Sequence, residues 1–173
     1  MFGSSVTLKP VTVTYLEMLS PAALRPKPSS DPRFRVLEAT VKQWRFNRFL
    51  YDLVGREWSW TGKQHWSEQQ WKNYVESDRL RTFAAFYDGS VAGYYELRAD
   101  ELDGIEIAIF GLAPEFIGRG FGAALLTSAL EGAWRAKPCR VWLHTCTLDH
   151  PAALPNYQAR GMTVYKVETN RLG

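Results

Sequence analysis

The chain has 173 residues, 46% of them hydrophobic, which fits one compact domain over residues 1–173 with a sizeable core and argues against a second domain. Its formal charge of +3 comes from scattered basic residues, so no nucleic-acid partner is expected. No apolar run is long enough to span a bilayer, so no membrane association is expected. Two cysteines seven residues apart, and a start without the charged and apolar regions of a signal peptide, indicate a reduced cytoplasmic protein.

The first predicted elements are a strand, a loop and a helix. Val6 to Leu16, broken by Pro10, is a strand candidate, and the Pro- and Ser-containing stretch from Ser20 to Pro32 is a loop. Apolar residues at helical spacing then predict a largely buried helix from Val36 to Val54, which ends at Gly55.

A second helix is predicted to begin at Ser67-Glu68-Gln69-Gln70, which has the form of a capping box, and to continue through Val75. The loop between the two helices is rich in aromatic residues. Together with Trp71 of the second helix, four tryptophans fall within fourteen residues, and we expect this region to line a substrate pocket or to pack in the core: Trp58, Trp60, Trp66 and Trp71.

From Arg81 onward the apolar period changes from that of a helix to that of a strand. Phe83 to Tyr87 and Val91 to Leu97 flank the hairpin turn Asp88-Gly89, and a third strand, Ile105 to Leu112, follows. We therefore expect three consecutive antiparallel strands.

The C-terminal part is predicted to contain a helix that packs one face on the sheet, a strand, a short helix and a last strand. The resulting order is β-α-α-β-β-β-α-β-α-β, an α/β (α+β) fold. The four elements are, in chain order, Ala123 to Ala136, Val141 to Thr145, Pro151 to Arg160 and Met162 to Val167.

A glycine-rich loop, Gly118-Arg119-Gly120-Phe121-Gly122, joins the strand Ile105 to Leu112 to the helix that follows. Free backbone N–H groups at the positive end of a helix dipole favour bound phosphate, so this loop is a candidate phosphate cradle. Two other interpretations stay open. One is a tight turn that binds nothing, and the other is a dinucleotide-binding loop, although the spacing is not G-x-G-x-x-G and the loop follows a hairpin.

The order of elements, the segment Leu112-Ala113-Pro114, the glycine loop, and Tyr157 four residues before Gly161 together resemble the GNAT superfamily of acyl-CoA N-acyltransferases. The resemblance covers about Phe83 to Glu168. It implies a mixed, mostly antiparallel sheet flanked by helices, with a cofactor-binding core at about residues 81–168 and the acceptor side in the N-terminal half. It implies acetyl-CoA as co-substrate. Members of the family are often dimers, so a homodimer is one option, but the sequence itself does not indicate the oligomeric state.

The resemblance also implies which residues meet the cofactor. The backbones of Leu112 and Ala113 would face the pantetheine arm, and His150 and Asn156 are further candidate contacts. The backbone N–H groups that would surround the diphosphate, with Arg119 adding charge, are those of Ile117, Gly118, Arg119, Gly120, Phe121, Gly122 and Ala123. No metal is expected, since the spacing of the His, Cys and Asp residues between 144 and 150 matches no usual zinc pattern.

An alkyl amine has a pKa of about 10.4, so presenting it neutral at pH 7 costs roughly 4 to 5 kcal/mol, and the reaction needs a base. A glutamate at the position of Glu106 is the general base in the histone-modifying branch of the family, which makes Glu106 the first candidate. Strand alternation would put it on the same face as Ala108 and Phe110. Glu96 on the adjacent strand is the alternative, and either carboxylate could instead be a surface residue.

Tyr157 is the candidate acid, because a phenol with a pKa of about 10 is still protonated at pH 7 and can donate to a departing thiolate. Its other interpretation is a buried packing residue. The acceptor is expected to be a primary amine of a small molecule or of a peptide or protein. The alternative function is a non-catalytic acyl-CoA sensor or interaction module, which would keep the glycine loop but would need neither Glu106 nor Tyr157.

Overall fold

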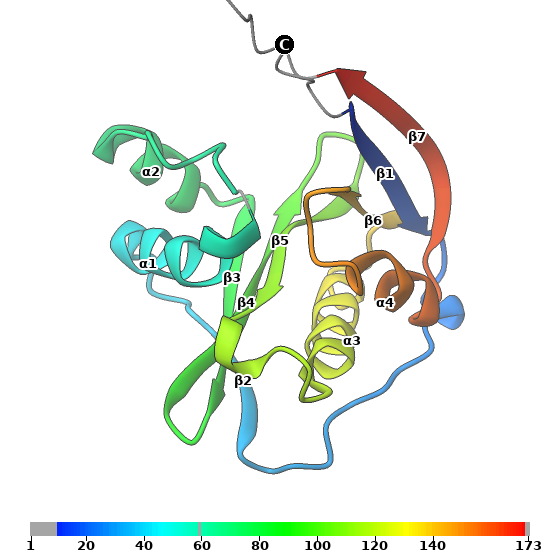
Figure 1. The fold of residues 1–173 in the computed structure, drawn as a ribbon, viewed down its shortest axis with the longest axis horizontal. Helices are drawn as coiled ribbons and strands as arrows, with labels where there is room; N and C mark the ends of the chain where they lie inside the picture. The colour runs from blue at the N-terminus through cyan, green and yellow to red at the C-terminus, as the bar shows by residue number, and fades with distance from the viewer. Residues whose placement is uncertain (1–9, 59, 172–173) are drawn as a thin grey trace, which may run out of the picture.

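The computed structural model describes residues 10–58 and 60–171. It contains a seven-stranded sheet with the strand order β2-β3-β4-β5-β6-β1-β7 (Figure 1). All neighbouring strands are antiparallel except β5 and β6, which are parallel. The mixed, mostly antiparallel sheet expected from the sequence is confirmed. The strands are β1 (Pro10–Met18), β2 (Phe34–Glu38), β3 (Leu80–Tyr87), β4 (Ser90–Ala99), β5 (Gly104–Leu112), β6 (Arg140–Cys146) and β7 (Thr163–Arg171).

Helices cover both faces of the sheet (Figure 1). The helix pair α1 and α2 packs on one face, where Leu50 and Trp71 are buried, and α3 with α4 packs on the other, where Leu130 and Leu143 are buried. The predicted capping box of α2 is confirmed, because Ser67 Oγ accepts the Gln70 N–H and the Gln70 side chain accepts the Ser67 N–H. The α-helices of the described residues are α1 (Trp44–Gly55), α2 (Glu68–Val75), α3 (Phe121–Trp134) and α4 (Ala153–Ala159), and short 3-10 turns occupy Pro21–Ala23, Arg56–Trp58 and Pro114–Phe116.

The predicted helix from Val36 to Val54 is wrong in its first part. Helix α1 begins only at Trp44, whereas Phe34–Glu38 forms the edge strand β2, with Val36 opposite Ala85 of β3. The order of elements is therefore β-β-α-α-β-β-β-α-β-α-β. The apolar residues Leu37 and Val41, which suggested a buried helical face, are 58% and 76% exposed. Pairing with β3 outweighs the local helical pattern here. The beginning of the predicted strand Val6 to Leu16 lies outside the described residues, and β1 starts at Pro10.

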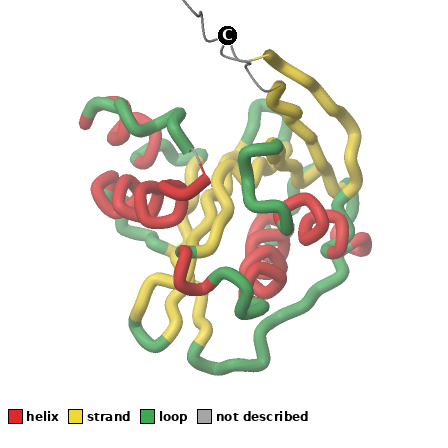
Figure 2. Tube along the Cα trace, viewed as in Figure 1, coloured by secondary structure: helices red, strands yellow, loops and turns green. Residues whose placement is uncertain are grey.

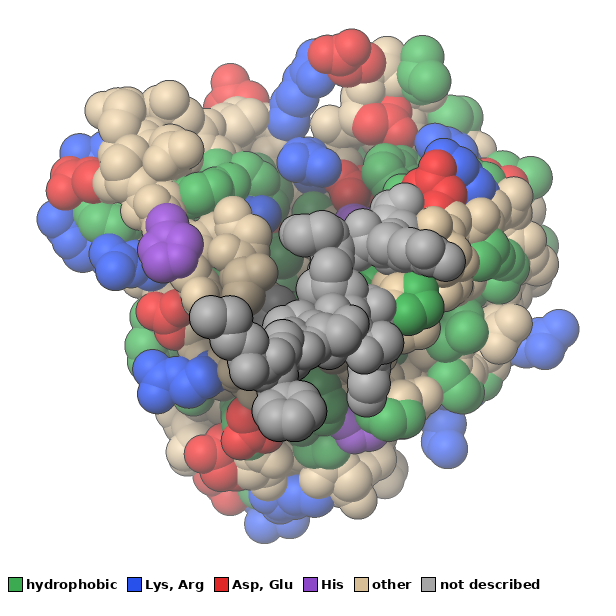
Figure 3. Space-filling view, turned by 45° about the horizontal axis from the view of Figure 1, so that its top comes forward, with side chains coloured by type: hydrophobic (Ala, Val, Ile, Leu, Met, Phe, Trp, Pro, Cys, Tyr) green, Lys and Arg blue, Asp and Glu red, His purple; other side chains and the backbone are tan. Residues whose placement is uncertain are grey.

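The loop between β1 and β2 runs along the outside of α3, as the green tube of Figure 2 shows. Two backbone donors hold it there: the Arg25 N–H bonds the Arg160 carbonyl oxygen, and the Lys27 N–H bonds Thr127 Oγ1 at 2.9 Å. On the face seen in Figure 3, basic and acidic side chains of the described residues are interspersed without a continuous basic patch. Among residues 10–58 and 60–171, no helix is long and apolar enough to cross a membrane.

Candidate active site

The candidate site lies where β5 and β6 separate. The two strands pair only at their beginnings, Gly104–Glu106 with Arg140–Trp142. Beyond that point the rest of both strands, residues 107–112 and 143–146, lines a cavity of about 750 Å³. The edge of β5 that faces the cavity therefore carries backbone donors and acceptors that no described strand pairs with, and an extended polar chain can bond to them.

The glycine loop closes one end of this cavity. Gly118 and Gly120 have φ values of +79° and +85°, a left-handed conformation that glycine adopts without the steric cost paid by other residues. Gly120 is the N-cap residue of α3, and no side chain caps the helix, so its first N–H groups are free to bind a ligand. Ile117, Gly118, Gly120, Gly122 and Ala123 line the cavity. This geometry fits a diphosphate held by backbone donors.

Two members of the loop point away from the cavity. Phe121 is buried and stacks on Phe34, with ring centroids 4.8 Å apart. The Arg119 guanidinium lies over the Tyr87 ring at 4.9 Å and also over the rings of Phe116 and Phe121. It lines a separate depression of about 380 Å³ instead of the main cavity.

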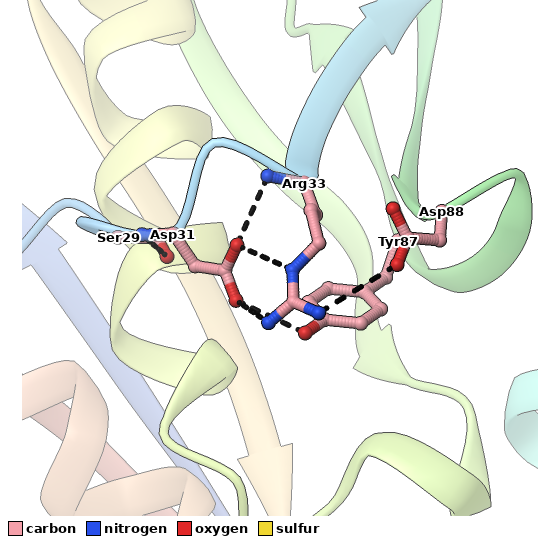
Figure 4. A network of polar contacts seen from close by, with 5 residues as sticks. All are labelled: Ser29, Asp31, Arg33, Tyr87 and Asp88. Carbon is pink, nitrogen blue, oxygen red and sulfur yellow. Dashed lines mark hydrogen bonds and ion pairs between the residues drawn. The ribbon is translucent and has the colours of Figure 1, made fainter.

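A network of polar contacts fixes the loop that borders this depression (Figure 4). Asp31 accepts three hydrogen bonds from Arg33 and one from the Tyr87 hydroxyl, while its own N–H donates to Ser29 Oγ. The Arg33 guanidinium also lies 3.8 Å from Asp88 at the hairpin turn. The bonds from Arg33 lower the pKa of Asp31 well below its usual range. The network thus ties the β1–β2 loop to the end of β3, next to the ring on which Arg119 lies.

Of the two residues expected to face the cofactor arm, only Leu112 lines the cavity. The expectation for Ala113 is wrong. Ala113 is fully buried, its N–H bonds the Ala92 carbonyl oxygen at 2.9 Å, and its own carbonyl accepts from the Phe116 N–H. Both backbone groups of Ala113 are therefore occupied within the fold.

Helix α4 and the turn before it bring three predicted residues to the opposite wall. Tyr157 is buried, lines the cavity and packs edge-on against Phe110, with ring centroids 5.8 Å apart. Burial, and to a lesser degree the charge of Asp149, raises the pKa of Tyr157 above its ordinary value of 10.0. Asn156 lines the cavity and donates to the Gly122 carbonyl at 3.1 Å, and His150 lines it while its Nδ1 accepts the Ala152 N–H.

The two candidate bases lie side by side, but on the other side of the sheet from Tyr157. Glu106 is buried and ion-paired with Arg98, which is opposite it on β4. Glu96 is 1% exposed and accepts hydrogen bonds from Asn47 at 2.8 Å and from the Tyr74 hydroxyl at 2.6 Å. Burial raises the pKa of Glu96. Neither carboxylate lines the cavity, so a proton could reach them only through an intervening group or water.

The expected alternation of Glu106 with Ala108 and Phe110 is wrong because β5 carries a bulge. Glu96 pairs with Ile109 and Leu97 pairs with Ile107, which leaves Ala108 as the extra residue. The bulge reverses the faces beyond it. Phe110 consequently packs on Tyr157, and Ile109 joins the core under α1 and α2, on the same face as Glu106.

The aromatic loop after α1 forms the third wall. Trp58 and Trp60 line the cavity, and Trp58 packs edge-on to His150 with ring centroids 4.9 Å apart. Trp66 and Trp71 instead pack on each other, and Trp71 is buried in the core under α1 and α2. Two of the four tryptophans therefore face the cavity and two do not.

Sequence reasoning missed two basic residues that line the cavity, Lys27 and Lys63. Lys27 lies in the long loop after β1 and is brought to α3 by its own backbone N–H. Lys63 lies in the aromatic loop, and its N–H donates to the Tyr51 hydroxyl at 3.3 Å. No motif surrounds either residue, so only the folded chain reveals them. Among the described residues, no group of three or more His, Cys, Asp or Glu side chains could hold a metal ion.

Comparison with known proteins gives a family. Residues 47–162 match the profile of the Acetyltransferase (GNAT) family. No curated protein sequence in the comparison matches the chain.

Solved structures give the fold. A GCN5-related N-acetyltransferase from Sphaerobacter thermophilus is 16% identical, with a TM-score of 0.69 over 93% of this chain and 51% of its own. A tandem GNAT protein from the clavulanic acid biosynthesis pathway is 16% identical, with a TM-score of 0.62 over 94% of this chain and 52% of its own. An aminoglycoside acetyltransferase from an uncultured soil metagenomic sample is 12% identical, with a TM-score of 0.63 over 76% of this chain and 90% of its own. The chain thus spans about half the length of the first two.

Proposed function

Because the chain belongs to the GNAT family of acetyltransferases, as the match over residues 47–162 shows, we propose that it transfers acetyl from acetyl-CoA to a primary amine of a small molecule or a peptide. The observation that carries the proposal is the cavity between β5 and β6, which ends at the uncapped N-terminus of α3. A free strand edge at one end and free helix N–H groups at the other match the amide-bearing arm and the diphosphate of a CoA ester.

Different residues would hold the pantetheine arm and the diphosphate of acetyl-CoA. The unpaired edge of β5, up to Leu112, would bond the pantetheine amides, and the N–H groups around Gly118 and Gly120 would bind the diphosphate. Gly120 fits this role because an added Cβ would meet nothing within 4 Å, so the backbone is open toward a ligand. Lys27, which also lines the cavity, would add positive charge near the phosphates. Acetyl-CoA supplies the activated acyl carbon and a thiolate leaving group.

Tyr157 would keep its proton until the sulfur departs. Its raised pKa maintains the neutral phenol through neutral pH, and its place in the cavity wall opposite β5 suits it to donate that proton. Glu106 remains the proposed base, acting through water, with Glu96 as the alternative. The ion pair with Arg98 keeps Glu106 in place, whereas the raised pKa of Glu96 suits it to hold a proton temporarily.

A thiol-release assay tests this function. The chain is incubated with acetyl-CoA and a panel of primary amines, from polyamines and amino sugars to lysine peptides, and the free CoA thiol is measured. The proposal expects amine-dependent release by the wild-type chain and none by Gly120→Trp, whose bulky side chain would fill the cradle. A chain that binds acetyl-CoA but releases no CoA with any amine would be a sensor and not an enzyme.

A further inference from the structure

The Lys63 side chain is enclosed by aromatic rings at the border of the candidate site. Its ammonium lies 4.7 Å from the ring centroids of Trp66 and Tyr74 and 5.9 Å from that of Tyr51. All three distances are within the range in which ring faces attract a cation. The rings come from α1, α2 and the loop between them, so the enclosure belongs to the predicted acceptor side of the protein.

The base of this enclosure is acidic, yet none of the described carboxylates forms an ion pair with Lys63. The Tyr74 hydroxyl, at the far end of one ring, donates to Glu96. The charges of Glu96 and Glu106 favour the Lys63 ammonium, and that of Arg98 opposes it. Among the described residues, no Asp or Glu oxygen lies within ion-pair distance of Lys63 Nζ. The Lys63 ammonium is therefore held by contacts with aromatic rings and by longer-range electrostatic interactions. It would not have to break an ion pair with a described carboxylate in order to move.

The same loop packs a side chain against the strand at which acetyl transfer is expected. Gly111 of β5 has no side chain, and Val54 of α1 and the Trp60 ring occupy the space beside it: a Cβ on Gly111 would lie 2.5 Å from Val54 Cγ1 and 3.3 Å from Trp60 Cη2. Lys63 follows three residues later, so at most about 11 Å of chain separates it from Trp60. Thr61, Gly62 and Lys63 all line the cavity together with Gly111 and Leu112. A primary amine of the protein thus lies in the wall of the cavity proposed to hold acetyl-CoA.

We propose that Lys63 is an acetyl acceptor of its own active site, an inference that rests on the proposed acetyl-CoA-dependent function. The Lys63 Nζ, once neutral, attacks the thioester carbonyl carbon. A nitrogen–carbon bond forms, the carbon–sulfur bond breaks, and the sulfur leaves as CoA thiol. The products from the lysine ammonium and acetyl-CoA are Nε-acetyl-lysine, CoA and one proton, which passes to solvent.

Two effects on the Lys63 ammonium oppose each other. The rings favour the charged form. Burial acts in the other direction and lowers the pKa of Lys63. The attacking species is the neutral amine, so the ammonium must lose its proton before Nζ reaches the thioester carbonyl. Because one chain holds both reactants, the transfer is intramolecular and occurs once per molecule.

Incubation of the full chain with isotopically labelled acetyl-CoA, with no added amine, tests the inference by peptide mass mapping. We expect label on Lys63 at a rate independent of protein concentration, and at least about 100-fold faster than on exposed lysines, because the bound donor has a high effective molarity. Lys63→Arg should lose this label while keeping its melting temperature. The matched control Lys72→Arg, which alters a half-buried lysine paired with Glu68 on α2, should label Lys63 as the wild type does.

Three outcomes would overturn the inference. Wild-type protein that binds acetyl-CoA and acetylates added amines, but leaves Lys63 unlabelled, would refute it while the proposed function stands. Equal labelling of Lys63 and of exposed lysines, unchanged in Gly120→Trp, would show non-enzymatic chemistry. If acetyl-CoA does not raise the melting temperature at all, the proposed function and this inference are both wrong.

Discussion

Replacing Gly120 by alanine tests the phosphate cradle without disturbing the packing of the rest of the fold. The change puts a methyl group where nothing lies within 4 Å, so it causes no clash inside the protein. Its effect on stability comes from the φ of +85°, which costs a non-glycine residue roughly 1 to 2 kcal/mol. In the proposed complex the methyl would meet the diphosphate. Loss of one charge-assisted hydrogen bond, worth about 1.5 to 3 kcal/mol, would weaken acetyl-CoA binding by about 10- to 150-fold.

Gly89 provides a matched control, because it also has open space around it and a φ of +87°, but lies in the β3–β4 turn and does not line the cavity. Gly89→Ala should therefore lose as much stability as Gly120→Ala and bind acetyl-CoA as the wild type does. Isothermal titration calorimetry gives both dissociation constants, and chemical denaturation gives both stabilities. Equal acetyl-CoA affinities for the two variants would refute the cradle.

Three further predictions concern the proposed acid and base. Tyr157→Phe should lower turnover by about 100-fold or more without weakening acetyl-CoA binding, as steady-state rates and calorimetry would report; unchanged turnover would remove its acid role. Glu106→Gln should move the pH optimum upward, because the amine must then lose its proton to solvent, and an unchanged pH–rate profile would point to Glu96. Burial raises the pKa of Glu96 in the folded protein, so its ionisation destabilises the fold as pH rises above the ordinary value of 4.5. Glu96→Gln should therefore gain stability relative to the wild type as the pH rises above 4.5 in urea titrations, and a difference that stays constant with pH would contradict this.

Local chemistry made several elements predictable from the sequence. The capping box at Ser67, the Asp88-Gly89 turn with its two positive φ values, and the helix after the glycine loop each depend on neighbouring residues only. Tyr157 was singled out because its spacing to Gly161 is a family pattern, and its catalytic role stays a prediction. Its position in the cavity wall follows from the fold.

Non-local pairing explains what sequence reasoning missed. Strand β2 exists because β3 offers an edge to Phe34–Glu38, and nothing in the local apolar spacing of Val36 and Leu37 distinguishes that strand from a helix. The bulge at Ala108 is likewise a property of the β4–β5 register, and it moves Phe110 to the face of Tyr157. The aromatic enclosure of Lys63 needs rings from three separate segments, so no linear sequence motif predicts it.

The most direct test of the central claim is the melting temperature of the chain with acetyl-CoA, CoA or NAD. A ligand present at 100 times its dissociation constant stabilises the folded state by about 2.7 kcal/mol. For a chain of this size that corresponds to a rise of roughly 5 to 11 °C. The account predicts such a rise with acetyl-CoA and with CoA, and none with NAD. A rise with NAD alone, or with none of the three, would contradict it.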